Sequence, residues 1–142
     1  MKILLAVDGS RHALAAVQCV IDHADWYREK PGVELVTVHL PVPTFRGMGA
    51  VIGKQHYERY YREEGDDRLA AARKKLDAAK IPHTDHILVG PVAENLVEKA
   101  VKTRCDLICV GSRGMTELGN ALLGSTATKV LHLSKMPVLL VK

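Results

Sequence analysis

The feature that most constrains the fold is a regular alternation of strand-length apolar runs with segments of helical periodicity. The strands are predicted at 2–8, 33–40, 82–90, 105–111 and 136–142, and the helices at 10–29, 54–80, 91–101 and 124–135. Parallel strands need crossover connections, and such crossovers are right-handed. The βαβαβαβαβ order therefore predicts an α/β fold: an open, doubly wound, five-stranded parallel sheet with helices on both faces.

Length and composition are those of a globular protein with one core. The chain has 142 residues, 47% of them apolar and 25% charged, which predicts a single domain over residues 1–142. The apolar runs are far shorter than the roughly 20 residues of a membrane span. The first of them ends at Asp8, too early for a signal peptide, so no membrane partner is expected.

The cysteines favour a reducing compartment. Cys19, Cys105 and Cys109 are odd in number and form no C-x-x-C pair, so we expect buried thiols rather than a disulfide framework. This usage predicts a cytoplasmic protein.

The charge pattern gives little support for nucleic-acid binding. The net charge is only +4, and both signs alternate along the predicted helix at 54–80. Tyr57, Tyr60 and Tyr61 lie among arginines, but their i, i+3, i+4 spacing predicts a stripe facing the core. No nucleic-acid partner is therefore expected.

The ends of the strands carry the residues most suited to function. In a doubly wound sheet, ligands bind beyond the carboxyl ends of the strands. The first strand is followed by Asp8-Gly9-Ser10, where Ser10 is a predicted helix N-cap, and the fourth ends in Gly111-Ser112-Arg113-Gly114. Residues 41–53, with two prolines and three glycines, are predicted to be a surface loop and a candidate lid.

The glycine-rich segment 111–126 has the features of a phosphate cradle. Gly111 and Gly114 allow close approach of the backbone, and Gly124-Ser125-Thr126 begins a predicted helix whose amides and dipole favour phosphate oxygens. Arg113 lies between the first two glycines, where it either pairs with a phosphate or faces solvent. Asp8 either takes part in the same site or only starts the first helix. Gly111 and Gly114 either approach a phosphate or are simply turn residues.

The commoner phosphate and metal motifs do not match. The stretch from Gly119 to Thr126 lacks the P-loop lysine, and the glycines at 47, 49 and 53 miss the dinucleotide spacing by one residue. The seven histidines form no cluster with metal-ligand spacing. No protein-held metal site is therefore expected.

The spacing G-x2-G-x9-G-[ST] after the fourth strand resembles the nucleotide-binding signature of the universal stress protein family. "KILLAVDGS", "VTVHL" and "MPVLLVK" are similar to the first, second and last strands of that family, so the resemblance covers the whole chain. It implies a Rossmann-like fold of the adenine nucleotide alpha hydrolase type. It also implies the branch of the family that binds ATP.

Carried over position by position, the resemblance implies a set of nucleotide contacts. Asp8 would lie near the ribose or the metal-bound phosphates, and Leu40, after His39, would offer backbone groups to the adenine. The phosphates would be surrounded by Gly111, Gly114, Gly124 and Ser125, with Thr126 close by. The implied ligand is ATP (or ADP or AMP), with Mg²⁺ held through the phosphates.

The resemblance also implies a homodimer through the C-terminal strand, residues 137–142, which as a short apolar edge strand invites such pairing on its own account. The function expected first is nucleotide-dependent regulation in a stress response, read out by an unknown protein partner. A slow ATPase or phosphotransferase remains an alternative. No P-loop lysine and no paired carboxylates accompany the segment, and Asp8 and Glu117 are the candidate bases near it. A nucleotide-free structural or chaperone-like dimer is the second alternative.

Overall fold

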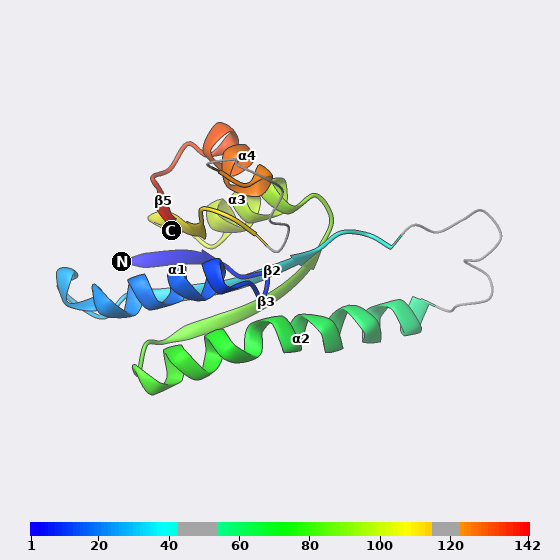
Figure 1. Ribbon diagram of the computed structural model, residues 1–142, viewed down its shortest axis with the longest axis horizontal. Helices are drawn as coiled ribbons and strands as arrows, with labels where there is room; N and C mark the ends of the chain where they lie inside the picture. Colours follow the sequence, from blue (N-terminus) through cyan, green and yellow to red (C-terminus); the bar gives the residue numbers. More distant parts are fainter. Residues whose placement is uncertain (43–53, 115–122) are drawn as a thin grey trace.

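The computed structural model describes residues 1–42, 54–114 and 123–142, and shows one parallel sheet (Figure 1). Its strands are β1 (Lys2–Ala6), β2 (Gly32–His39), β3 (His83–Val89), β4 (Leu107–Gly111) and β5 (Val138–Val141). They lie in the order β3-β2-β1-β4-β5, and every pair is parallel. The predicted fold class is therefore confirmed. Most of the predicted loop at 41–53 falls outside the described residues.

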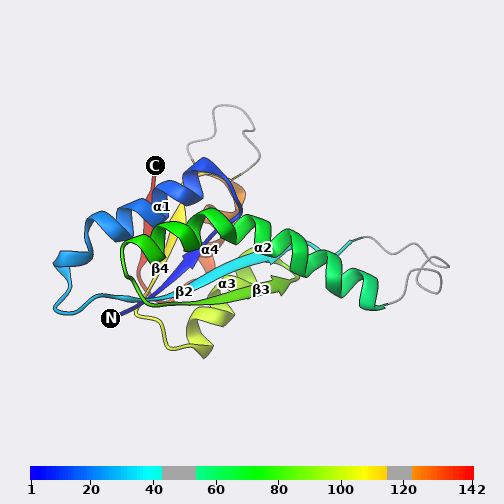
Figure 2. The ribbon, with the colours of Figure 1, turned by 90° about the horizontal axis from the view of Figure 1, so that it is seen from below.

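The helices cover both faces of the sheet. They are α1 (Arg11–Asp22), α2 (Lys54–Ala78), α3 (Val92–Lys102) and α4 (Ser125–Leu133). Figure 2 shows α1 and α2 together on one face, and α3 and α4 lie on the other. Within the described residues, no helix is long and apolar enough to cross a membrane.

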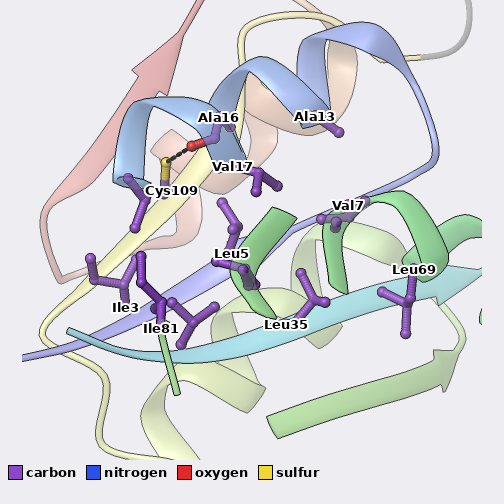
Figure 3. Close-up of a cluster of buried hydrophobic side chains, with 14 of the residues drawn as sticks. Ile3, Leu5, Val7, Ala13, Ala16, Val17, Leu35, Leu69, Ile81 and Cys109 are labelled. Carbon is purple, nitrogen blue, oxygen red and sulfur yellow. Dashed lines mark hydrogen bonds between the residues drawn. The ribbon is translucent and has the colours of Figure 1, made fainter. Parts of the chain in front are cut away.

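Alternate side chains of the central strands fill two separate hydrophobic layers. Ile3 and Leu5 of β1 pack toward α1 and α2, whereas Leu4 and Ala6 pack toward α3 and α4. Figure 3 shows the first layer, where Leu35 of β2 and Leu69 of α2 complete the contact. Because both faces of β1 are buried, its sequence is continuously apolar rather than alternating, as is typical of parallel sheets.

The first helix is shorter than predicted, ending at Asp22 rather than near residue 29. A 3₁₀ turn at Ala24–Trp26 follows it. The His23 ring, through Nδ1, lies 2.7 Å from the carbonyl oxygen of Cys19, which also accepts the backbone N–H of His23. This local hydrogen bond, which apolar periodicity does not reveal, closes the last turn of α1.

A polar cluster ties three strands together near their amino ends. Glu34 of β2 is 7% exposed and binds Lys2 Nζ of β1 at 3.0 Å and the His86 Nε2 of β3. Burial alone would raise the pKa of the Glu34 carboxyl, but the hydrogen bonds from His86 and Lys2 outweigh burial and lower that pKa. Glu34 is therefore ionised and satisfied inside an otherwise apolar layer.

Glu34→Gln should lower the free energy of unfolding by about 1–3 kcal/mol at pH 7, because it weakens hydrogen bonds to a buried carboxylate. Since the folded-state pKa of Glu34 lies below its unfolded value, this stabilisation is present above about pH 4.3 and is lost as the pH falls through the folded pKa. Urea unfolding of parent and variant between pH 7 and 3 should therefore give converging stabilities at acid pH.

Glu98→Gln is the matched control, because Glu98 pairs with Lys102 one turn away on the exposed face of α3. It should leave the unfolding midpoint unchanged. Equal effects of the two substitutions would contradict the role given to Glu34.

Candidate functional site

A cavity of about 890 Å³ opens at the carboxyl ends of β1, β2 and β4. It lies where the strand order reverses, since β1 is followed by α1 on one face and β4 is followed by α4 on the other. All of the site residues expected from the sequence line it: Asp8, Leu40, Gly111, Arg113, Gly114, Gly124, Ser125 and Thr126. The structure therefore brings together residues 118 positions apart in the chain.

The turn between β1 and α1 orients the Asp8 carboxylate. Its Oδ1 accepts the backbone N–H of Ser10 at 2.9 Å, while Ser10 Oγ accepts the N–H of Ala13 and caps α1 as predicted. Gly9 has φ of +86°, which bends the chain between them. Asp8 thus accepts a hydrogen bond at the start of α1 and also lines the cavity.

The two ends of the glycine-rich segment are joined by backbone contacts. The N–H of Gly124 donates to the carbonyl oxygen of Ser112 at 2.8 Å. A side chain at Gly124 would meet the Arg113 Cα at 3.3 Å, and one at Gly114 would meet Asp8 Oδ2 at 3.0 Å. The two described ends of the segment therefore pack closely on each other, and Gly114 lies beside the Asp8 carboxylate. Gly119 lies outside the described residues.

Gly111 has a packing reason for being glycine that the sequence did not indicate. A Cβ atom there would lie 2.8 Å from the carbonyl carbon and oxygen of His12, in the first turn of α1. Gly111 therefore allows α1 to approach β4, in addition to lining the cavity.

The first turn of α4 presents backbone amides to the cavity. Its N-cap is Gly124, which has no side chain to accept a hydrogen bond from them, and Ser125 and Thr126 follow directly. Such an N-terminus favours an anion because its N–H groups and dipole point toward it. Arg113 beside it is exposed, which leaves both of its possible roles open.

A second wall of the cavity is apolar. It is formed by side chains from β2, α3, β4 and α4: Val36, Val38, Val92, Leu96, Val110 and Ala127. Leu40, directly after β2, lies at its rim and is 69% exposed. A flat apolar group fits such a wall, with polar contacts available from backbone at the rim.

A third wall, formed by α2 and the end of β2, was missed by sequence reasoning. It carries His39, Tyr60, Tyr61, Glu64 and Arg68. The prediction that the tyrosines form a core stripe is wrong, because Tyr60 is 45% exposed and α2 extends past the ends of β2 and β3 there (Figures 1 and 2). The spacing of residues 60, 64 and 68 on one helical face is a signal that could have indicated this wall.

The side chains of this wall interact closely. Glu64 Oε1 accepts Arg68 Nη2 at 2.7 Å, and Glu64 Oε2 lies 3.9 Å from His39 Nδ1. His39 is 3% exposed and packs on the Tyr61 ring at 5.6 Å. Burial, with a smaller contribution from Arg68, lowers the pKa of His39. The imidazole is therefore held neutral.

The described residues contain no group of three or more His, Cys, Asp or Glu side chains placed to hold a metal ion. The arrangement is instead suited to binding an elongated ligand with an anionic end and an apolar end. Its anionic end would face main-chain amides and hydroxyls, and its apolar end the valine-rich wall.

Comparison with known proteins gives a consistent result. The model of the "Universal stress protein family" matches residues 1–142. A universal stress protein of Thermus aquaticus is 34% identical over 99% of this chain and 97% of its own length. The solved structure of hypothetical protein MJ0577 of Methanocaldococcus jannaschii superposes with a TM-score of 0.82 at 30% identity, covering 99% of this chain and 94% of that one.

A more distant structure shares the fold. The universal stress protein from Archaeoglobus fulgidus, solved in complex with dAMP, has a TM-score of 0.64 at 20% identity and covers 100% of this chain and 98% of its own. The family model and the relatives lead to the conclusion that this chain belongs to the universal stress protein family.

Proposed function

We propose that the chain binds ATP, with Mg²⁺ held through the phosphates, and acts as a nucleotide-dependent regulatory protein in a stress response. The observation that carries the proposal is that one cavity collects Asp8, Leu40, the three glycines, Arg113 and the α4 N-terminus. A dAMP complex of a protein with the same fold favours an adenine nucleotide as the ligand class.

In this proposal each wall has one task. The adenine lies against the valine-rich wall, with backbone groups at Leu40 reading its edge. The phosphates lie against Gly111, Gly114, Gly124 and Ser125, where amides and the α4 dipole offset their charge. Thr126 and Arg113 border the same region.

Mg²⁺ fits this site as a companion of the phosphates. Mg²⁺ keeps several waters and needs only one or two protein carboxylates when phosphates supply its other ligands. Asp8, held by Ser10 and adjacent to Gly114, is the carboxylate placed to serve it or the ribose. Bound Mg²⁺ would neutralise part of the phosphate charge.

The first experiment is a calorimetric titration of the purified protein with ATP, ADP, AMP and adenosine in Mg²⁺, together with mass analysis of any nucleotide that copurifies. Binding of ATP without turnover supports the regulatory function. Phosphate release faster than about 1 s⁻¹ would instead support an ATPase or phosphotransferase. Absence of binding would leave a nucleotide-free structural or chaperone-like dimer.

Ser125→Ala should weaken ATP by about five- to tenfold, because it removes a hydroxyl donor to a charged group, and should leave adenosine affinity almost unchanged. Calorimetry with both ligands measures this difference. Thr128→Ala is the control, since Thr128 lies one turn later and its hydroxyl binds the carbonyl of Gly124. Equal losses of ATP and adenosine in Ser125→Ala would move Ser125 away from the phosphates.

We further propose a homodimer formed through β5, within residues 137–142, in the cytoplasm. β5 ends the strand order, and its Leu139 is 38% exposed. An apolar edge strand of this kind is suited to pairing with a second copy. The three cysteines are free thiols, in keeping with a reducing compartment.

Leu139→Lys should shift the protein from dimer to monomer in analytical ultracentrifugation, because it places a charge in the proposed interface. Val101→Lys is the matched control, since Val101 is 61% exposed on α3, on a different part of the surface. A parent protein that sediments as a monomer would refute the dimer directly.

A further inference from the structure

The α2 wall of the cavity has no task in the nucleotide site proposed above. Tyr60, Glu64 and Arg68 lie on one face of α2 at successive turns, and all three line the cavity. They face the same space as the glycine-rich segment but come from a different part of the chain. They therefore place one positive and one negative charge on the wall of the cavity, beside a phenol hydroxyl.

Arg68 is anchored beside the Asp8 turn. Its Cγ lies 3.6 Å, and its Cα 3.8 Å, from the position that a Cβ of Gly9 would take. The side chain is 23% exposed and lines the cavity, so most of its surface is packed. An anchored arginine loses little conformational freedom when it binds a ligand.

The charged side chains around the cavity do not neutralise the negative charge of a triphosphate. Among the described residues, its lining contains two carboxylates, Asp8 and Glu64, and two guanidinium groups, Arg68 and Arg113. They sum to zero, and the segment lacks the lysine that a P-loop would supply. Arg113 is exposed, whereas Arg68 is held by packing on the β1–α1 turn.

Glu64 is hydrogen-bonded to Arg68 on the cavity wall. The Glu64 carboxylate accepts hydrogen bonds from the Tyr60 hydroxyl and from Arg68, and both lower its pKa. It is therefore ionised, and its pair with Arg68 occupies guanidinium donors that a phosphate would otherwise use. A carboxylate and a phosphate both suit the guanidinium fork, which has five N–H donors.

We propose that Arg68 binds the phosphate chain of the nucleotide, and that Glu64 is the carboxylate that holds Arg68 without nucleotide and lowers phosphate affinity. The inference rests on the proposed function and adds α2 to the site. It makes affinity depend on the number of phosphates, because only a charged chain gains from Arg68 and is opposed by Glu64.

The test is calorimetry of ATP and adenosine binding in Mg²⁺ at 150 mM salt, on five variants and the parent. Arg68→Gln should weaken ATP by about 10- to 100-fold and adenosine by less than about twofold, as expected for a hydrogen bond between charged groups. Arg68→Lys keeps the charge but not the forked guanidinium, so its ATP affinity should lie between those of the parent and Arg68→Gln. Arg62→Gln, exposed on the same helix, should bind like the parent.

Glu64→Gln should act in the opposite direction and strengthen ATP binding by about threefold or more, with no gain for adenosine. The double variant Glu64→Gln, Arg68→Gln should bind ATP no better than Arg68→Gln alone, because the gain passes through Arg68. Thermal unfolding without nucleotide checks that each variant is folded.

The outcomes separate the inference from the function on which it rests. If the parent does not bind ATP, both fall. If the parent binds ATP and Arg68→Gln binds it equally well, or loses ATP and adenosine alike, only the role of Arg68 is overturned. If Glu64→Gln weakens ATP, Glu64 positions the ligand rather than competing with it, and that half of the inference is wrong.

Discussion

The structure depends on one topological constraint, the reversal of strand order between β1 and β4. The chain leaves β1 for α1 on one face and leaves β4 for α4 on the other. Two neighbouring strands whose connections diverge cannot fill the space above their carboxyl ends, so a crevice remains there. The cavity, the Asp8 turn and the α4 N-terminus all follow from this reversal.

The glycine-rich segment shows how one motif can both allow close packing and line a cavity. Gly111 admits α1, Gly124 admits the backbone of residues 112–114, and Gly114 admits the Asp8 carboxylate. These contacts join the walls before any ligand arrives, so the amides are held in place by the fold itself. Preorganised donors of this kind lose little freedom on binding. Loss of binding on substituting Gly111 would therefore report on packing as much as on ligand contact.

The α2 helix changes the chemical character of the cavity. The glycine-rich and valine-rich walls alone would make an anion site beside an apolar site. Glu64, Arg68 and the neutral His39 add a polar wall whose charges cancel pairwise. The helix that carries the Arg68–Glu64 pair also packs on α1 and on the sheet through Leu69 (Figures 2 and 3). A rearrangement of this pair would therefore take place on an element that is part of the hydrophobic core.

The sequence alone determined the fold class, the order of elements and the glycine-rich residues that line the cavity, because apolar periodicity and strand-end position are local properties. Asp8, Gly111, Gly114, Gly124 and Ser125 could be named for the same reason: their types and spacing are visible along the chain. The tertiary structure alone decided which residues of α2 face the cavity, and that Gly111 serves the approach of α1. Periodicity identifies the faces of a helix but not what each face meets, since that depends on how far α2 extends past the sheet. The spacing of the three tyrosines therefore predicts a core position, although Tyr60 and Tyr61 line the cavity.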